Sequence, residues 1–162
     1  MQELLYLPRL LCQKNPLRRI KILKNPKYGD YSDNILIRAH HLLCIQGFQG
    51  KGYSDEFLKN MDHIIKILDN KTSIVKVIDE PDPICSYCPH LKENVCFESD
   101  NSEKRIKLMD NMTLQIIGLE CGQTYPYHEI VDKIKNISFS QLSEICGYCQ
   151  WRDFCLLYSK LK

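Results

Sequence analysis

The sequence has little of what marks a fibrous, disordered or membrane-spanning chain. Its 162 residues include only seven glycines and seven prolines, which excludes a collagen-like or low-complexity chain. Apolar residues make up 44% of the chain, too many for intrinsic disorder. Stretches with few charges run for about a dozen residues, against the roughly 20 that a membrane-spanning helix needs. We therefore expect one globular domain and no membrane partner.

The N-terminal stretch lacks the marks of a secretory signal. Glu3 stands where a signal has basic residues, and Pro8 and Arg9 interrupt the apolar run. We therefore expect a cytoplasmic protein, in a reducing compartment where cysteines more often serve metals or catalysis than crosslinks.

Charge is unevenly distributed along the chain. Residues 1–29 contain seven Lys and Arg against a single acidic residue, a balance of +6, so the remainder carries −4 of the net +2. We interpret residues 1–32 as a basic, partly disordered N-terminal extension and residues 33–162 as a cysteine-rich metal-binding domain. Because that domain is mildly acidic, a nucleic-acid partner is not expected.

Hydrophobic periodicity predicts a mainly helical α+β domain with a small β-sheet. β-Branched segments predict strands over residues 35–38 and 74–78. Apolar spacing predicts helices over residues 39–48, 54–69, 102–117, 127–136, from about 140 onward and over 150–160. Ser54 and Ser102 are the expected N-caps of two of these helices. Loops are expected elsewhere, including 90–100, with the cysteine-rich metal-binding loops gathered at one end of the molecule.

Nine cysteines stand out in this background, and their odd number leaves at least one unpaired in any disulfide framework. Six of them form two triplets, each a C-x-x-C pair followed by a third cysteine: Cys85, Cys88 and Cys96, then Cys146, Cys149 and Cys155. The C-x-x-C spacing lets two thiolates converge on one ion or cluster. Two such triplets indicate metal binding. Cys12 and Cys121 are expected to take no part.

Each triplet is one ligand short of the usual four. The candidates for the missing ligands are Cys44, His40, His41 and His90. On a helix, His40 and His41 lie four and three residues before Cys44, so all three share one face. This arrangement suits a metal site or acid–base chemistry beside one. It equally suits one buried and one surface histidine with Cys44 in the core.

The spacing of the cysteines does not distinguish zinc from an iron–sulfur cluster. Zinc prefers closed tetrahedral sites of Cys and His, such as the first triplet completed by His90. Iron–sulfur clusters use the same thiolates, and four cysteines drawn from both triplets would hold one cluster. About 50 residues with two predicted helices separate the triplets, which permits either one shared site or two.

Several motifs, in order, resemble a small prokaryotic family, domain of unknown function 1284. They are the segment 37–44 with its two histidines and Cys44, the glycine-rich segment 47–53, Cys85-x-x-Cys-Pro-His90, and Cys146-x-x-Cys149 with Cys155. The resemblance covers residues 35–160. Its members are described as candidate iron–sulfur-binding proteins, and the family pattern implies as site residues His40, His41, Cys44, Cys85, Cys88, His90, Cys96, Cys146, Cys149 and Cys155.

Three functions are therefore under consideration. The first is an iron–sulfur protein, with a [4Fe–4S] cluster held by the triplet cysteines, acting in electron transfer or redox sensing with a redox or protein partner. The second is a zinc-stabilised interaction module without catalysis. The third is a metal-dependent enzyme that uses His40 and His41.

Overall fold

The structure, a computed structural model, describes residues 34–162. The extension predicted for residues 1–32 lies outside the described residues, as does Cys12. From Asn34 onward the chain has a mainly helical α+β architecture, which confirms the expected fold class. Within this described part, no helix combines the length and the apolar character that crossing a membrane requires.

A three-stranded sheet forms the base of the fold, in the order β1-β2-β5. Strands β1 (Ile35–Arg38) and β2 (Ile74–Ile78) are parallel, and both match the predicted strands. Strand β5 (Thr124–Pro126) adds an antiparallel edge beside β2. It was not predicted, because three residues that end in proline carry no alternating pattern.

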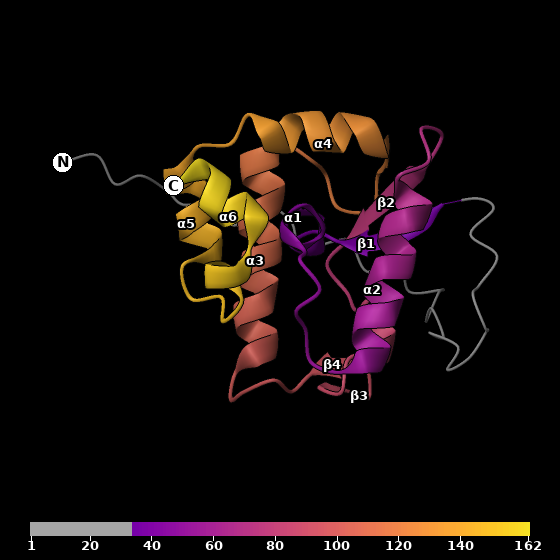
Figure 1. Cartoon of the computed structure of the whole chain (residues 1–162), viewed down its shortest axis with the longest axis vertical. Helices are drawn as coiled ribbons and strands as arrows, with labels where there is room; N and C mark the ends of the chain where they lie inside the picture. Colours follow the sequence, from indigo (N-terminus) through magenta and orange to yellow (C-terminus); the bar gives the residue numbers. More distant parts are fainter. Residues whose placement is uncertain (1–33) are drawn as a thin grey trace.

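Residues 34–162 form six helices around the sheet, as Figure 1 shows: α2 and α3 run upright on opposite sides of α1 and β1, α4 crosses the top, and α5 and α6 lie beyond α3. Their bounds are α1 His41–Gly47, α2 Asp55–Leu68, α3 Ser102–Ile117, α4 Tyr127–Lys135, α5 Phe139–Cys146 and α6 Leu156–Leu161. The first five agree with the predicted ranges to within two residues, whereas α6 begins six residues later than predicted. The 3-10 turn η1 (Cys85–Tyr87) lies within the first C-x-x-C pair, and the 3-10 turn η2 (Arg152–Phe154) follows the second.

The prediction that Ser54 is the N-cap of α2 is confirmed, and the prediction that Ser102 is the N-cap of α3 is wrong. The Ser54 hydroxyl accepts a hydrogen bond from the Phe57 N–H, as a cap of α2 should. At α3 the cap position is Asn101, whose φ is 61°. Ser102 is instead the first helical residue, and its hydroxyl donates to the Cys96 carbonyl at 2.6 Å. Tertiary contact with the preceding cysteine has therefore displaced the cap.

The segment 90–100, expected to be a loop, contains a short hairpin. Strands β3 (Leu91–Lys92) and β4 (Val95–Cys96) pair antiparallel, with Leu91 opposite Cys96. Glu93 and Asn94 have φ values of 49° and 62°, as a two-residue type I′ turn requires. Strands of two residues are too short for periodicity to reveal. The cysteines thus lie at the ends of short elements rather than in long loops.

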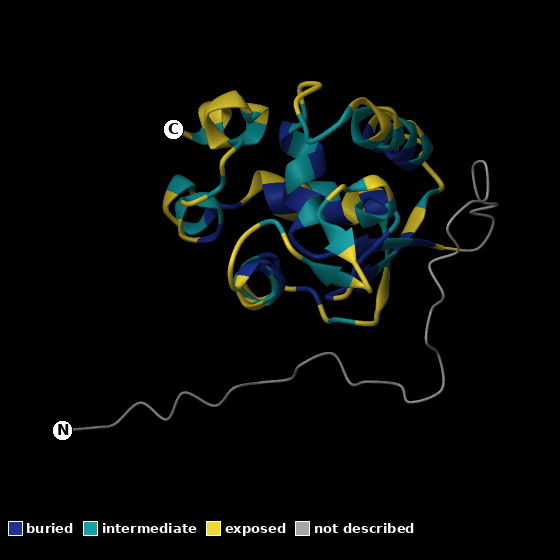
Figure 2. Cartoon of the chain, turned by 90° about the horizontal axis from the view of Figure 1, so that it is seen from below, coloured by how far each residue is buried: buried dark blue, intermediate teal, exposed yellow. Residues whose placement is uncertain are grey.

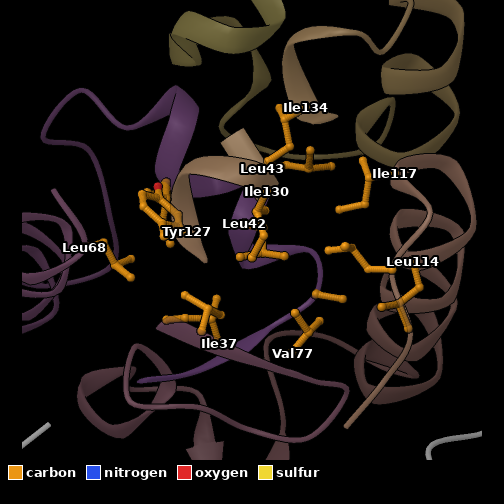
Figure 3. Close-up of a cluster of buried hydrophobic side chains, with 14 of the residues drawn as sticks. Ile37, Leu42, Leu43, Leu68, Val77, Leu114, Ile117, Tyr127, Ile130 and Ile134 are labelled. Atoms are coloured by element: carbon orange, nitrogen blue, oxygen red, sulfur yellow. The ribbon is translucent and has the colours of Figure 1, made fainter. Parts of the chain in front are cut away.

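The hydrophobic core lies between the sheet and the helices. Figure 3 shows side chains from both layers converging on one cluster, among them Ile37 of β1, Val77 of β2, Leu42 of α1, Leu114 of α3 and Ile130 of α4. All are buried. This core positions α1, whose first residues carry the histidine pair.

Two segments contribute no buried residue to that core. Residues 85–101 and 146–162 contain no buried residue, although each holds a full cysteine triplet. Figure 2 shows the last helix, beside the C-terminus, in the colours of intermediate and exposed residues only. Leu157, Tyr158 and Leu161 of α6 pack against the core while partly exposed. Hydrophobic contact therefore holds the last segment only in part, and residues 85–101 less still.

Candidate metal centre

The candidate site begins at the carboxyl ends of the two parallel strands. β1 ends at Arg38 and leads directly into His40 and His41, while the segment after β2 carries Asp82 and Cys85. Neighbouring parallel strands end at the same edge of a sheet, where open α/β sheets usually bind their ligands. Residues more than 40 positions apart are thereby brought together.

Asp82 organises the first part of the site. Its side chain is buried, and its oxygens accept hydrogen bonds from the Arg38 N–H at 2.8 Å and the Cys85 N–H at 3.1 Å, and contact Nδ1 of His41 at 2.8 Å. Burial tends to raise the pKa of Asp82, but His41 and these hydrogen bonds outweigh it and lower the pKa. An ionised carboxylate only accepts, so Nδ1 of His41 carries the proton and Nε2 keeps a free lone pair.

Asp110 of α3 holds the second histidine in the same way. Its Oδ1 lies 2.7 Å from Nδ1 of His40 and accepts the His40 backbone N–H at 3.1 Å. Its Oδ2 accepts from Nε of Arg38, a fully buried guanidinium, at 2.7 Å. Burial tends to raise the pKa of Asp110, but His40 and Arg38 outweigh it and lower the pKa to about 2. Burial and the neighbouring His41 lower the pKa of His40, which favours its neutral form.

The cysteines surround two adjacent cavities. The larger, of about 160 Å³, is lined by Cys44 together with the second triplet, Cys146, Cys149 and Cys155. The smaller, of about 80 Å³, is lined by the first triplet, Cys85, Cys88 and Cys96. Six residues line both cavities: His40, His41, Tyr53, Phe57, Glu98 and Ile106. The triplets therefore face separate cavities with a common wall.

The larger cavity has four thiols from two distant parts of the chain. Burial raises the pKa of Cys44, and so does charge repulsion from Cys149, Cys146 and Cys155, which line the same cavity. Burial, with Cys149 and Cys155, also raises the pKa of Cys146 to about 12. A bound cation would reverse this effect and stabilise the thiolates.

Gly47 makes this grouping possible. A Cβ atom at Gly47 would lie 2.1 Å from Sγ of Cys155, far inside any allowed contact. Gly47 is also the last residue of α1, the helix that carries Cys44. The absence of a side chain lets the Cys155 sulfur rest against α1, three residues along from Cys44.

The smaller cavity has three thiols and the shared histidines. Burial raises the pKa of Cys88, and hydrogen bonds from the backbone N–H groups of His90 and Leu91 oppose that effect. Such bonds to sulfur favour the thiolate that a metal needs. Among residues 34–162, only one group of three or more His, Cys, Asp or Glu has its ligand atoms all within 4.8 Å of one another, and it is His41, Asp82 and Cys85.

One predicted site residue, His90, is placed differently. It lines neither cavity, and its ring packs edge-on against Tyr53 with centroids 4.8 Å apart. Cys121, which was expected to take no part in the site, is disulfide-bonded and lines neither cavity.

Sequence reasoning missed Asp82, Asp110, Arg38 and Glu103. A signal existed for Asp110, since a carboxylate within the apolar stripe of a helix must find a buried partner. A weaker signal existed for Asp82, which stands between two prolines three residues before Cys85.

Comparison with known proteins gives one family. A family model described as "Protein of unknown function (DUF1284)" matches residues 52–155, which include both triplets but neither His40, His41 nor Cys44. No curated protein and no solved structure matches the chain.

Proposed function

We propose a function for this chain, which belongs to the DUF1284 family of proteins of unknown function: it is an iron–sulfur protein acting in electron transfer. A [4Fe–4S] cluster would be held by Cys44, Cys146, Cys149 and Cys155. The observation that carries the proposal is the convergence of these four thiols on one cavity of about 160 Å³. Four cysteines are the usual complement for such a cluster.

The charge of the cavity wall supports this assignment. Four thiolates in one place need nearby positive charge, and Lys51, Arg105 and Arg152 line the same cavity, against the single carboxylate of Glu98. Arg105 acts to lower the pKa of Cys149, although burial keeps that pKa raised overall. The basic side chains thus offset part of the charge that bound thiolates would introduce.

The way the C-terminal segment is attached supports it as well. Residues 146–162 contain no buried residue, yet they supply three of the four thiols. A cluster would bond this segment to Cys44 on α1, which is anchored in the core. Binding free energy at such a site is also folding free energy.

Electron transfer is the role that the position of the cavity favours. A [4Fe–4S] cluster supplies one-electron oxidation and reduction when bound. Tyr148, between two of the cysteines, is 94% exposed, and Phe154, next to Cys155, is 53% exposed. A redox partner can therefore approach this wall of the cavity closely.

Anaerobic purification with iron and sulfide analysis tests the proposal. We expect a brown protein with about four iron and four sulfide per chain and the broad visible absorbance of a [4Fe–4S] cluster. Cys44→Ser and Cys149→Ser should each lose the cluster. Cys96→Ser, the matched thiol-to-hydroxyl change in the other cavity, should keep it.

Two results would count against the proposal. A protein that binds no iron or sulfide after anaerobic reconstitution excludes the cluster. Loss of the cluster in Cys96→Ser with retention in Cys44→Ser would mean that the cluster is held by the triplet cysteines without Cys44.

A further inference from the structure

One close group of metal-binding donors stands apart from the four thiols of the proposed cluster. It consists of His41, Asp82 and Cys85, whose ligand atoms all lie within 4.8 Å of one another. We infer that these three residues form a second and separate site, for one zinc ion, with its fourth position open to the smaller cavity. This inference does not depend on the presence of the cluster.

The sheet brings the three donors together. His41 lies three residues beyond the end of β1, and Asp82 and Cys85 lie on the segment that follows β2. The two strands are parallel neighbours, and the core holds both of them. The donors are therefore placed by the fold itself, so an ion that binds them requires little rearrangement of the backbone.

The contact between His41 and Asp82 has the dimensions of two ligands on one ion. Nδ1 of His41 lies 2.8 Å from Oδ2 of Asp82. Two donors bound to one zinc ion at about 2.0 Å lie about 2.8 to 3.3 Å apart. With a small rotation of the imidazole ring, zinc can take the place of the Nδ1 proton. That proton and the thiol proton of Cys85 are released to solvent, as is usual when metals bind histidine and cysteine.

Asp82 is held in place by hydrogen bonds that zinc would leave intact. The Arg38 N–H donates to Oδ2 of Asp82 at 2.8 Å, and the Cys85 N–H donates to Oδ1 at 3.1 Å. A carboxylate oxygen has two lone pairs. Oδ2 therefore keeps one for the Arg38 N–H and offers zinc the one that the Nδ1 proton of His41 now uses. Such outer hydrogen bonds typically orient metal-binding carboxylates.

The charges at the site match a divalent cation. The Asp82 carboxylate and the Cys85 thiolate together bring two negative charges. The buried guanidinium of Arg38 does not neutralise them, because it is paired with Asp110 at 2.7 Å and Glu103 at 3.2 Å. Sulfur and nitrogen donors favour zinc over calcium and magnesium, which take oxygen ligands.

The smaller cavity provides the open position. His41 and Cys85 line it, while Asp82 is buried and does not. Its volume of about 80 Å³ exceeds the roughly 10–15 Å³ that a water molecule needs. Three protein ligands and one water are the arrangement of catalytic zinc sites, whereas structural zinc has four protein ligands. The fourth ligand is therefore a water that a small anion can replace.

Metal analysis of the full chain, purified anaerobically after growth with added zinc and iron, tests the inference. We expect one zinc per chain in the unmodified protein, and its loss in His41→Gln and Cys85→Ser. The matched control is Cys96→Ser, which should keep the zinc, because Cys96 lines the same cavity but lies outside the close group. His128→Gln, a change at an exposed histidine of α4, should keep it too.

Two results of this experiment would overturn the inference. One is full zinc in Cys85→Ser, and the other is an equal loss of zinc in Cys96→Ser and Cys85→Ser. Cys44→Ser should lose the iron and keep the zinc, which separates the two sites. One zinc without iron in the unmodified protein, retained in Cys44→Ser, would contradict only the proposed cluster.

A further variant tests whether Asp82 binds the ion or only orients His41. Loss of an orienting partner typically weakens metal binding by about 10- to 100-fold. Asp82→Asn removes a ligand and should therefore weaken zinc binding by more than about 100-fold, as measured by competition with a chromophoric chelator. A smaller loss would overturn the three-ligand site.

Cobalt substitution keeps the inference testable if His41→Gln, Cys85→Ser or Asp82→Asn fails to fold. Cobalt(II) added to Cys44→Ser should show the ligand-field bands of a tetrahedral site and a thiolate charge-transfer band. Addition of azide should shift these bands, because the anion replaces the water at the open position. An octahedral cobalt spectrum would overturn the inference, and bands that do not respond to azide would overturn the open position.

Discussion

At the scale of single residues, two buried carboxylates determine the chemistry of the histidine pair. Asp82 holds Nδ1 of His41 and Asp110 holds Nδ1 of His40, and both histidines line the two cavities. Asp110 has a second task, because it also neutralises the buried guanidinium of Arg38. The Asp110 carboxylate thus both stabilises the fold and orients His40.

The variant Asp110→Asn tests how far Asp110 stabilises the fold through Arg38. It leaves the Arg38 charge buried without its main partner, which should lower the free energy of unfolding by about 3–5 kcal/mol. Urea denaturation at pH 7 measures this. Asp62→Asn, which removes an exposed carboxylate paired with Lys66 on α2, should leave the unfolding midpoint unchanged; an equal effect from both variants would contradict the role of Asp110.

The same variant has a defined pH signature. The pKa of Asp110 is lowered to about 2 in the folded protein from an ordinary value of 3.8, so the carboxylate stabilises the fold above about pH 4. That contribution should disappear as the pH falls from about 4 to about 2. The stability difference between the unmodified protein and Asp110→Asn should therefore shrink over that range.

At the scale of elements, the short helix α1 joins the two ends of the described chain. It begins at His41, which lines both cavities, and ends at Gly47, which lies against Cys155 of the larger cavity. Its buried face packs in the core through Leu42 and Leu43. The helix therefore carries candidate ligands, His41 and Cys44, on a support that is anchored in the core.

Gly47→Ala should displace Cys155, because the new Cβ would stand 2.1 Å from its sulfur. We expect the iron content to fall several-fold while the helical circular dichroism stays unchanged. Gly118→Ala is the control: it places a side chain at φ 64° but meets only Lys133 Nζ, at 3.9 Å. It should cost about 1 kcal/mol of stability and keep full iron; full iron in Gly47→Ala would show that the close approach does not matter.

At the scale of the whole molecule, the described chain has a hydrophobic core and two segments that carry the cysteine triplets. The core connects the sheet with α1, α2, α3, α4 and α5. Segments 85–101 and 146–162 have no buried residue and face the two cavities. Under the proposed function, metal ligands would take the place of a core in these segments, as they do in small metal-binding domains.

Removal of metal should therefore loosen these two segments first. Limited trypsin digestion of chelator-treated protein should cut at exposed basic residues within them, such as Lys92, Arg152 and Lys160, while metal-loaded protein resists cleavage there. Mass spectrometry of the fragments identifies the sites. If cleavage begins instead within α2 or α3, metal stabilises the whole fold and not these segments in particular.

Much of the fold could be predicted because its signals are local. The helices at 54–69 and 102–117 have apolar stripes over several turns, and both β-branched strands are present where expected. The hairpin at Cys96 and the strand at Tyr125 were missed, since two or three residues carry no periodicity. The cap at Ser102 was wrong because its hydroxyl bonds to Cys96, a contact that only tertiary structure creates.

The sequence by itself determined the types of ligand and their pairing into C-x-x-C turns, because that geometry is set within four residues. It also placed His40, His41 and Cys44 on one helix. Only the tertiary structure decided that Cys44 lines one cavity with the second triplet, 102 positions away at Cys146, and that His41 meets Asp82 and Cys85. The reason is physical: these groupings depend on where the core places α1 and on which strand ends meet at one sheet edge, and long-range packing leaves no local pattern in the chain.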